Sequence, residues 1–193
     1  MEDIIFRQLI LSTFAFATPL LLASLGELIG ERAGVLNISL EGMMLVGAWC
    51  GAAASFGSGS GWIGLLAAVL GGVVSAALFA FLTFTFKGDA IVVGTGINLL
   101  ALGATGVAHR ALGDHAVNYA SVPLPQWIFS LAGVILVPLL WWMFNSTFMG
   151  LRLRAVGEYP LAAEAAGIPV PRMRWTATLI NGALCGLAGA FLS

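Results

Sequence analysis

Charged side chains are the scarcest component of this 193-residue chain. It carries 8 Lys and Arg against 9 Asp and Glu, so 9% of its residues are charged, where soluble domains have about 25%. The hydrophobic share is 60%, and the mean hydropathy is +1.00. This composition excludes a soluble fold. Because the net charge is −1 and no basic stripe exists outside one loop, it also argues against nucleic acid as a partner.

Residues that could build a metal centre or a catalytic site are equally few. The two cysteines, Cys50 and Cys185, lie far apart inside apolar runs, where small buried residues of membrane helices are expected. His109 and His115 lie close in sequence, but no serine or cysteine accompanies them as an activated nucleophile. The phosphate-binding pattern G-x-x-x-x-G-K-S/T is absent, so we predict no ATP site. We likewise predict no catalytic residue, no metal ligand and no cofactor.

Long apolar runs dominate what is present. About 20 apolar residues cross a bilayer as a helix, and the chain holds six runs of that kind, which predict an all-α, polytopic transmembrane bundle in a single domain, 1–193. The predicted spans are 4–28, 33–56, 62–86, 90–108, 127–148 and 175 onward. The last run would extend roughly 28 Å, barely enough to cross, and ends without a polar anchor. We therefore expect the chain to be incomplete at its C-terminus.

Half of the basic residues fall in one loop, 149–175. Lys and Arg concentrate in short cytoplasmic loops of membrane proteins, so this loop is predicted to lie inside; its arginines are Arg152, Arg154, Arg172 and Arg174. Within it, Pro160 and Gly167 bracket a short Ala-rich helix, with a proline at the first helical position and a glycine just past the last. Such a helix has little apolar side chain to bury, which is typical of a docking element.

The position of this loop sets the expected orientation of the other segments. Counting back from it places the loop 110–126 outside, Lys87 to Asp89 inside and the N-terminus outside. The stretch 27–41 is too charged to be an ordinary span, and a broken or re-entrant piece there would invert everything before it. Glu27 and Glu31 are expected at the headgroup level, with Arg32 as their neutralising partner.

Asn37 and Glu41 are the most informative polar residues in the apolar runs. On a continuous helix from Ala33, four residues separate them, so both would face the bundle interior on one stripe. A charge near the bilayer centre costs about 2.5 to 3.5 kcal/mol, so Glu41 should not face lipid. Two interpretations stay open: a polar element beside the translocation path, or a helix-terminal glutamate satisfying backbone donors of a broken helix.

Asn98 and the glycine pair Gly182 and Gly186 each allow two interpretations as well. Asn98 follows Gly94 and Gly96 in the fourth predicted span, where it could line a path or form an interhelical hydrogen bond. Small residues four apart, such as Gly182 and Gly186, let helix backbones approach closely. The sequence alone does not show whether these glycines pack against a helix of the same subunit or against a second copy of the chain.

Two blocks of sequence carry a family resemblance. Residues 151–158 (LRLRAVGE) and 163–170 (AEAAGIPV) resemble the cytoplasmic coupling loop of an ABC importer permease. Residues 30–44 (GERAGVLNISLEGMM) are similar to the signature of permeases for nucleosides and simple sugars, in the branched-chain and ribose-type binding-protein-dependent family. In older permease families the glycine lies a few residues beyond Glu-Ala-Ala, whereas here Gly167 follows at once, so detailed contacts do not transfer from them.

The resemblance implies a multi-pass permease subunit of the bacterial inner membrane, surrounded by lipid, that moves nucleosides or related small polar solutes by alternating access. Its implied partners are a second permease subunit, an ABC ATPase that hydrolyses the ATP, and an extracytoplasmic substrate-binding protein. Family members continue through several further spans. The implied coupling residues are Arg152, Arg154, Glu158, Glu164, Ala165, Ala166, Gly167, Arg172 and Arg174.

Two other classes of function compete with this one. A secondary, ion-coupled transporter would need coupling-ion carboxylates near the midplane, and apart from Glu41 and the boundary acids there are few. A membrane-embedded enzyme would need a nucleophile with a base, or a metal cluster, deep in a span. The secondary transporter is the stronger alternative of the two.

Overall fold

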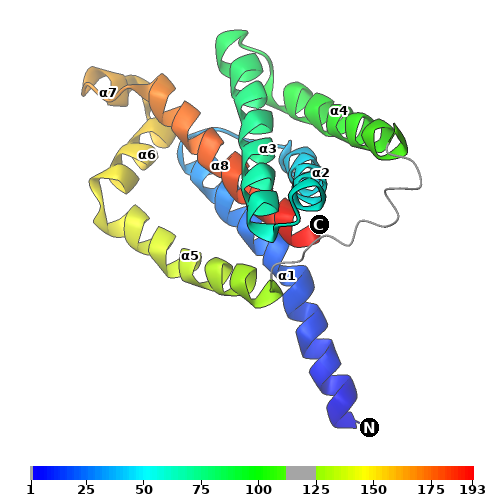
Figure 1. The fold of residues 1–193 in the computed structure, drawn as a ribbon. Coiled ribbons are helices and arrows are strands. Elements are labelled where there is room, and N and C mark those ends of the chain that lie inside the picture. Colours follow the sequence, from blue (N-terminus) through cyan, green and yellow to red (C-terminus); the bar gives the residue numbers. More distant parts are fainter. Residues whose placement is uncertain (1, 112–124) are drawn as a thin grey trace.

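A computed structural model describes residues 2–111 and 125–193, and every regular element in these ranges is helical (Figure 1). The outer loop predicted at 110–126 falls almost entirely outside the described residues. The all-α prediction is confirmed for the part that the structure describes. Its elements are α1 (Glu2–Arg32), α2 (Leu40–Ser58), α3 (Gly61–Ala80), the π-helical turn η1 (Phe81–Thr85), α4 (Ala90–Ala111), α5 (Gln126–Ser146), α6 (Phe148–Glu158), α7 (Pro160–Ala165) and α8 (Val170–Leu192).

Four helices in the described part of the chain are long and apolar enough to cross a membrane. They confirm four of the six predicted spans: Gly61–Thr85, Ala90–Ala111, Gln126–Ser146 and Val170–Leu192. The remaining two predicted spans correspond to α1, which has 31 residues, and α2, which has 19.

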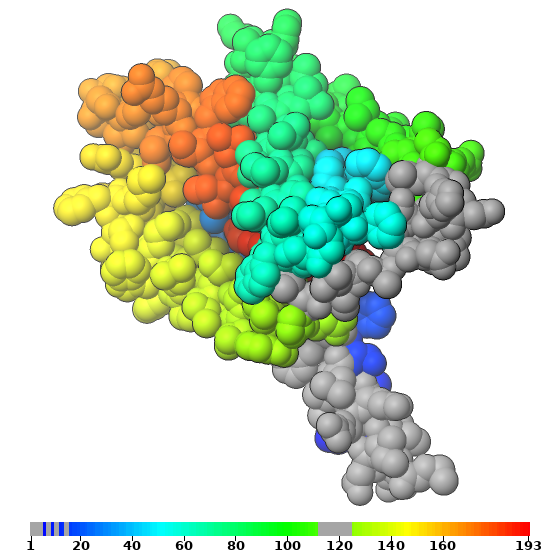
Figure 2. All heavy atoms as spheres, viewed as in Figure 1, coloured from blue at the N-terminus to red at the C-terminus, as the bar shows by residue number. Residues whose placement is uncertain are grey.

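The helix α8 forms the centre of the molecule. Half of the residues in its most apolar 18-residue stretch are buried, against 17 to 33% in the other three helices of spanning length. It packs against α1, α2 and α3, and Figure 2 shows α3 in teal and α5 and α6 in yellow on either side of it. A Cβ added at Gly186 would lie 2.5 Å from the carbonyl oxygen of Ala68 on α3, and Gly182 meets Gly72 and Ala76 on the same helix. The glycine pair thus packs within the chain.

The predicted span 33–56 is wrong at its start. The helix α1 continues to Arg32 instead of ending at Leu28, and α2 begins only at Leu40. Gly34 has a φ of +74°, and the N–H groups of Gly34 and Val35 donate to the carbonyls of Glu31 and Gly30. This pairing is the Schellman motif that ends helices at a left-handed glycine. Residues 33–39 therefore form a non-helical connection, called here the interhelix segment.

Candidate functional site

The loop 149–175 folds into a helical corner. Thr147 caps α6 by accepting a hydrogen bond from the Gly150 N–H at 3.2 Å. Pro160 occupies the first turn of α7, and Gly167, with a φ of +79°, ends it by the same Schellman pairing. The predicted short, bounded helix is confirmed. In Figure 1 it lies at the tip of the corner between α6 and α8.

The surface of α7 is almost entirely exposed. Ala163 is the one buried residue of this helix, whereas Leu161 is 82% exposed. The preceding Tyr159 is 72% exposed. Leu161 and Tyr159 thus lie exposed beside the smooth Ala-rich surface of this short helix. Nothing in the described part of the chain covers this surface.

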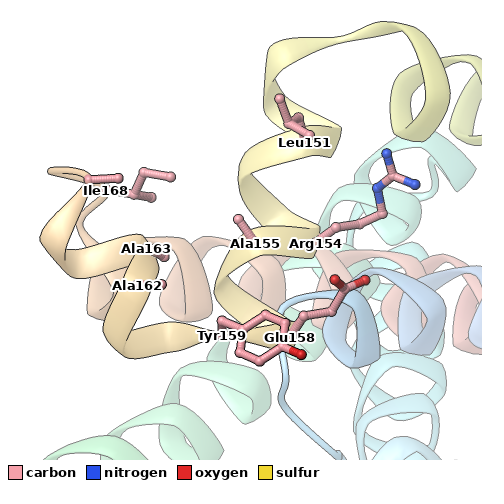
Figure 3. Close-up of a pocket in the computed structure, with 9 residues that line it drawn as sticks. Leu151, Arg154, Ala155, Glu158, Tyr159, Ala162, Ala163 and Ile168 are labelled. Carbon is pink, nitrogen blue, oxygen red and sulfur yellow. The ribbon is translucent and has the colours of Figure 1, made fainter.

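A hollow of about 510 Å³ separates α6 from α7 (Figure 3). Ala155 points across it from α6, while Arg154 and Glu158 extend from the same helix with their charged groups turned away from α7. The residues that line the hollow are Leu151, Arg154, Ala155, Glu158, Tyr159, Ala162, Ala163, Ala166 and Ile168.

The predicted coupling residues therefore divide into three groups. Arg154, Glu158 and Ala166 line the hollow. The residues exposed elsewhere on the corner are Arg152, Glu164, Ala165, Gly167 and Arg172. Arg174 is half-buried at the start of α8, where its Nε donates to the carbonyl of Ala33 at 3.4 Å.

The interhelix segment lies directly against α6. A Cβ added at Gly157 would come 2.5 Å from the carbonyl oxygen of Arg32 and 3.1 Å from the nitrogen of Gly34. A Cβ at Gly34 would meet the Cα of Gly157 at 3.1 Å. Because both neighbours are backbone, only glycine permits this approach. The end of α6 and the turn after α1 are thus in close backbone contact.

A buried polar network fixes the same segment to the core. Asn37 is 2% exposed, and its N–H donates to Oε1 of Glu27 at 2.9 Å. Oε2 of Glu27 accepts from Nδ2 of Asn181 on α8 at 2.8 Å. Oδ1 of Asn37 accepts from the N–H and hydroxyl of Ser39. The Glu27 carboxylate therefore ties α1, the interhelix segment and α8 together.

Sequence reasoning missed this network. It assigned Glu27 to the headgroup level and did not single out Asn181 at all. The available signal was an amide interrupting the last apolar run, since a polar group inside a membrane helix needs a partner. The sequence could not say that the partner lay 154 residues earlier.

Asn37 and Glu41 do not share a stripe, so that prediction is wrong. The segment around Asn37 is not helical; Asn37 is buried, while Glu41 is exposed in the first turn of α2.

Asn98 on α4 forms interhelical hydrogen bonds, which were one of the two alternatives predicted for it. Its Oδ1 accepts from the Gly42 N–H at 2.8 Å, and its Nδ2 donates to the carbonyl of Ile38 at 3.0 Å. It thus satisfies one of the free first-turn donors of α2.

Substitutions at Asn98 and at Glu41 are expected to change the stability of the protein by different amounts, because Asn98 forms hydrogen bonds between helices and Glu41 is exposed. Asn98→Ala removes the side-chain amide that forms both hydrogen bonds. The Gly42 N–H and the Ile38 carbonyl are then left unpaired, which should cost about 1 to 3 kcal/mol of stability. Glu41→Gln should change stability by less than about 0.5 kcal/mol, as exposed substitutions usually do. Thermal unfolding of the detergent-solubilised variants measures both. An Asn98→Ala variant as stable as wild type would contradict the bonding role.

Comparison with known proteins agrees with the two sequence blocks. A family model described as the branched-chain amino acid transport system / permease component matches residues 9–193. The chain belongs to this permease family. No solved structure matches it.

Several relatives of the permease have names that state a solute. The putative glucose ABC transporter permease protein TsgC13 of Haloferax volcanii is 36% identical over 205 residues, covering 94% of this chain and 61% of that protein. The guanosine ABC transporter permease protein NupQ of Bacillus subtilis (strain 168) is 32% identical over 206 residues, covering 92% of this chain and 64% of that protein. The nucleoside ABC transporter permease protein NupC of Lactococcus lactis subsp. cremoris (strain MG1363) is 36% identical over 202 residues, covering 91% of this chain and 63% of that protein. The chain spans just under two thirds of the length of each.

Proposed function

We propose that this chain is part of the membrane-spanning subunit of an ABC importer that moves nucleosides or related small polar solutes, sugars included, across the bacterial inner membrane. Membership of the permease family and the names of TsgC13, NupQ and NupC support this. Because this sequence carries no phosphate loop, a separate ATPase subunit is proposed to hydrolyse the ATP. A second permease subunit and an extracytoplasmic binding protein complete the proposed assembly. Nothing among the relatives favours an ion-coupled secondary transporter.

Six crossings are proposed, with α1 and α2 joining the four helices of spanning length. The Arg174 bond to Ala33 brings the end of α1 beside the start of α8. If the arginine-rich corner is cytoplasmic, then α1 ends inside and the N-terminus lies outside. The exposed Glu41 is proposed to face a water-filled path, because a charge near the bilayer centre is costly in lipid.

The single observation that carries the coupling proposal is the exposure of α7. A helix of six residues, which begins at Pro160, is followed by the left-handed Gly167 and is buried at Ala163 alone, offers its surface to a partner. We propose that the ATPase docks there and that its closure moves α6 together with α7. The backbone contact between Gly157 and Gly34 then passes this movement to the interhelix segment, and Glu27 passes it to α8. Alternating access would follow from the resulting shift of the spans.

Substitutions on α7 test the docking surface. Leu161 makes no buried contact, so Leu161→Asp should leave insertion intact but reduce ATPase co-purification about tenfold, which corresponds to about 1.4 kcal/mol of binding. Leu161→Ile is the matched control and should retain the ATPase. Uptake measured in the same cells should fall with association. A cross-linker at exposed Ala165 that reached only lipid or the binding protein would contradict the docking role.

The proposed function has its own test. The permease reconstituted with its ATPase and binding protein should accumulate labelled nucleoside only when ATP is supplied. Concentrative uptake without ATP, driven by an ion gradient, would overturn the proposal in favour of the secondary transporter.

A further inference from the structure

A second cavity, of about 270 Å³, lies between α1, α5 and α6. It is separate from the Glu27 network, although Arg154 also lines the hollow between α6 and α7. Leu25 on α1 and Val137 on α5 lie at its apolar end. At about 30 Å³ per water, the volume matches roughly nine water molecules. A headgroup with its first methylenes fits this space, whereas a whole phospholipid does not.

Two arginines line the cavity, and no carboxylate does. Arg32 is in the last turn of α1, and Arg154 reaches the cavity from α6. The guanidinium of Arg32 lies 5.9 Å from the centre of the Phe144 ring, a cation–π distance. Within residues 2–111 and 125–193, neither arginine forms an ion pair with a carboxylate. The lining of the cavity thus carries two positive charges and no negative one.

The polar and apolar lining residues separate along the helices. Leu25 precedes Arg32 by seven residues, and Val137 precedes Asn145 by eight, so the two ends lie roughly 10 to 12 Å apart. Both arginines and Asn145 are at the end near the arginine-rich corner, with Trp141 one turn before Asn145. Tryptophan at the headgroup level above an apolar wall is the usual arrangement at a membrane interface.

We infer that this cavity binds the phosphate headgroup of an anionic phospholipid from the leaflet beside the arginine-rich corner, with the start of an acyl chain along Leu28 and Leu140. Basic pockets between membrane helices on the cytoplasmic side bind such headgroups. Guanidinium groups pair with phosphate through charge-assisted, bidentate hydrogen bonds. The apolar part of the cavity favours a lipid over free phosphate, because an acyl chain packs against apolar side chains and a phosphate ion does not. The leaflet assignment rests on the proposed orientation.

Lipid retention by the purified chain tests the site without any transport measurement. Native mass spectrometry should find phosphatidylglycerol bound after mild delipidation, and the double variant Arg32→Gln with Arg154→Gln should lose most of it. The control Arg152→Gln with Arg172→Gln removes the same charge from exposed positions on the same corner and should retain the lipid. Leu28→Trp, which fills the apolar wall between Leu25 and Arg32 without changing charge, should also reduce retention.

Each other outcome overturns the inference. Equal loss in the control pair would indicate a general attraction to the basic corner. Displacement of the lipid by inorganic phosphate, with no effect of Leu28→Trp, would indicate a free-phosphate site. Retention unchanged in the double variant, or a second copy of the chain covering the face in cross-linking, would leave no lipid site. Since the assay needs no ATP, failure of the importer proposal would appear separately, as ATP-independent uptake with lipid still bound.

Discussion

Gly157→Val is expected to abolish most ATP-driven uptake while leaving the permease inserted in the membrane and bound to its ATPase. The new side chain would enter the 2.5 Å space in front of the Arg32 carbonyl. No side chain can rotate away there, so α6 must shift from the interhelix segment or accept about 1 to 3 kcal/mol of strain. Uptake should fall about tenfold or more, the equivalent of about 1.4 kcal/mol, with ATP hydrolysis continuing. Parallel assays of uptake and hydrolysis measure the ratio.

The matched control for this substitution is Gly57→Val. A Cβ at Gly57 would meet no atom within 4 Å, so the same change of residue tests the effect of a valine without the close contact. Uptake and hydrolysis should both stay near the wild-type level. Normal uptake in Gly157→Val would show that the contact with Gly34 does not transmit coupling. Loss of the ATPase from the complex would indicate a displaced docking surface instead.

The short helix α7 could be predicted from sequence because its limits are local. Pro160 fixes the start, and Gly167 supplies the left-handed residue that ends it. Both signals act within a few residues, so the structure reproduces them. The four long apolar runs are equally local, since length and hydropathy decide whether a helix can span a bilayer.

The interhelix segment could not be predicted in the same way. Gly34 gave a termination signal of the same kind, but the residues after it are mostly apolar and resemble the start of a span. A buried turn is possible only if distant side chains pair with its backbone. Glu27 binds the Asn37 N–H, and Asn98 binds the Ile38 carbonyl from 60 residues away. Hydropathy and periodicity contain no information about such partners, and the expectation that Asn37 and Glu41 share one stripe was wrong for this reason.

In the candidate site, too, some features follow from the local sequence and others depend on contacts between distant segments. The exposed, Ala-rich surface of the corner followed from composition and capping. The connection from this corner to the core did not, because it depends on Gly157 meeting Gly34 and on Arg174 reaching Ala33. Each of these contacts joins segments that are more than 100 residues apart in the chain.

The Glu27 network predicts reciprocal rescue between two residues. Asn181→Asp places a carboxylate where the amide now donates to Glu27 at 2.8 Å, and two carboxylates at that distance repel strongly. Glu27→Gln brings two amide groups together and removes the charge that accepts both hydrogen bonds. Each single variant should lose about 1 to 3 kcal/mol of stability through unpaired buried groups. In the double variant Glu27→Gln with Asn181→Asp, the carboxylate and the amide exchange places, so the pair can form again.

Thermal unfolding of the four proteins gives the interaction energy directly as a double-mutant cycle, which we expect to lie within the roughly 0.5 to 3 kcal/mol usual for contacting residues. The amide oxygen introduced by Glu27→Gln can still accept from the Asn37 N–H, so the interhelix segment should stay in place in the double variant. Uptake per ATP hydrolysed should then recover together with the unfolding temperature, because the same bond ties α8 to the segment that α6 contacts. Additive losses in the double variant would mean that Glu27 and Asn181 do not act as a pair. Recovery of stability without recovery of uptake would restrict the pair to holding the fold, and α8 would receive the movement of α6 through Arg174 instead.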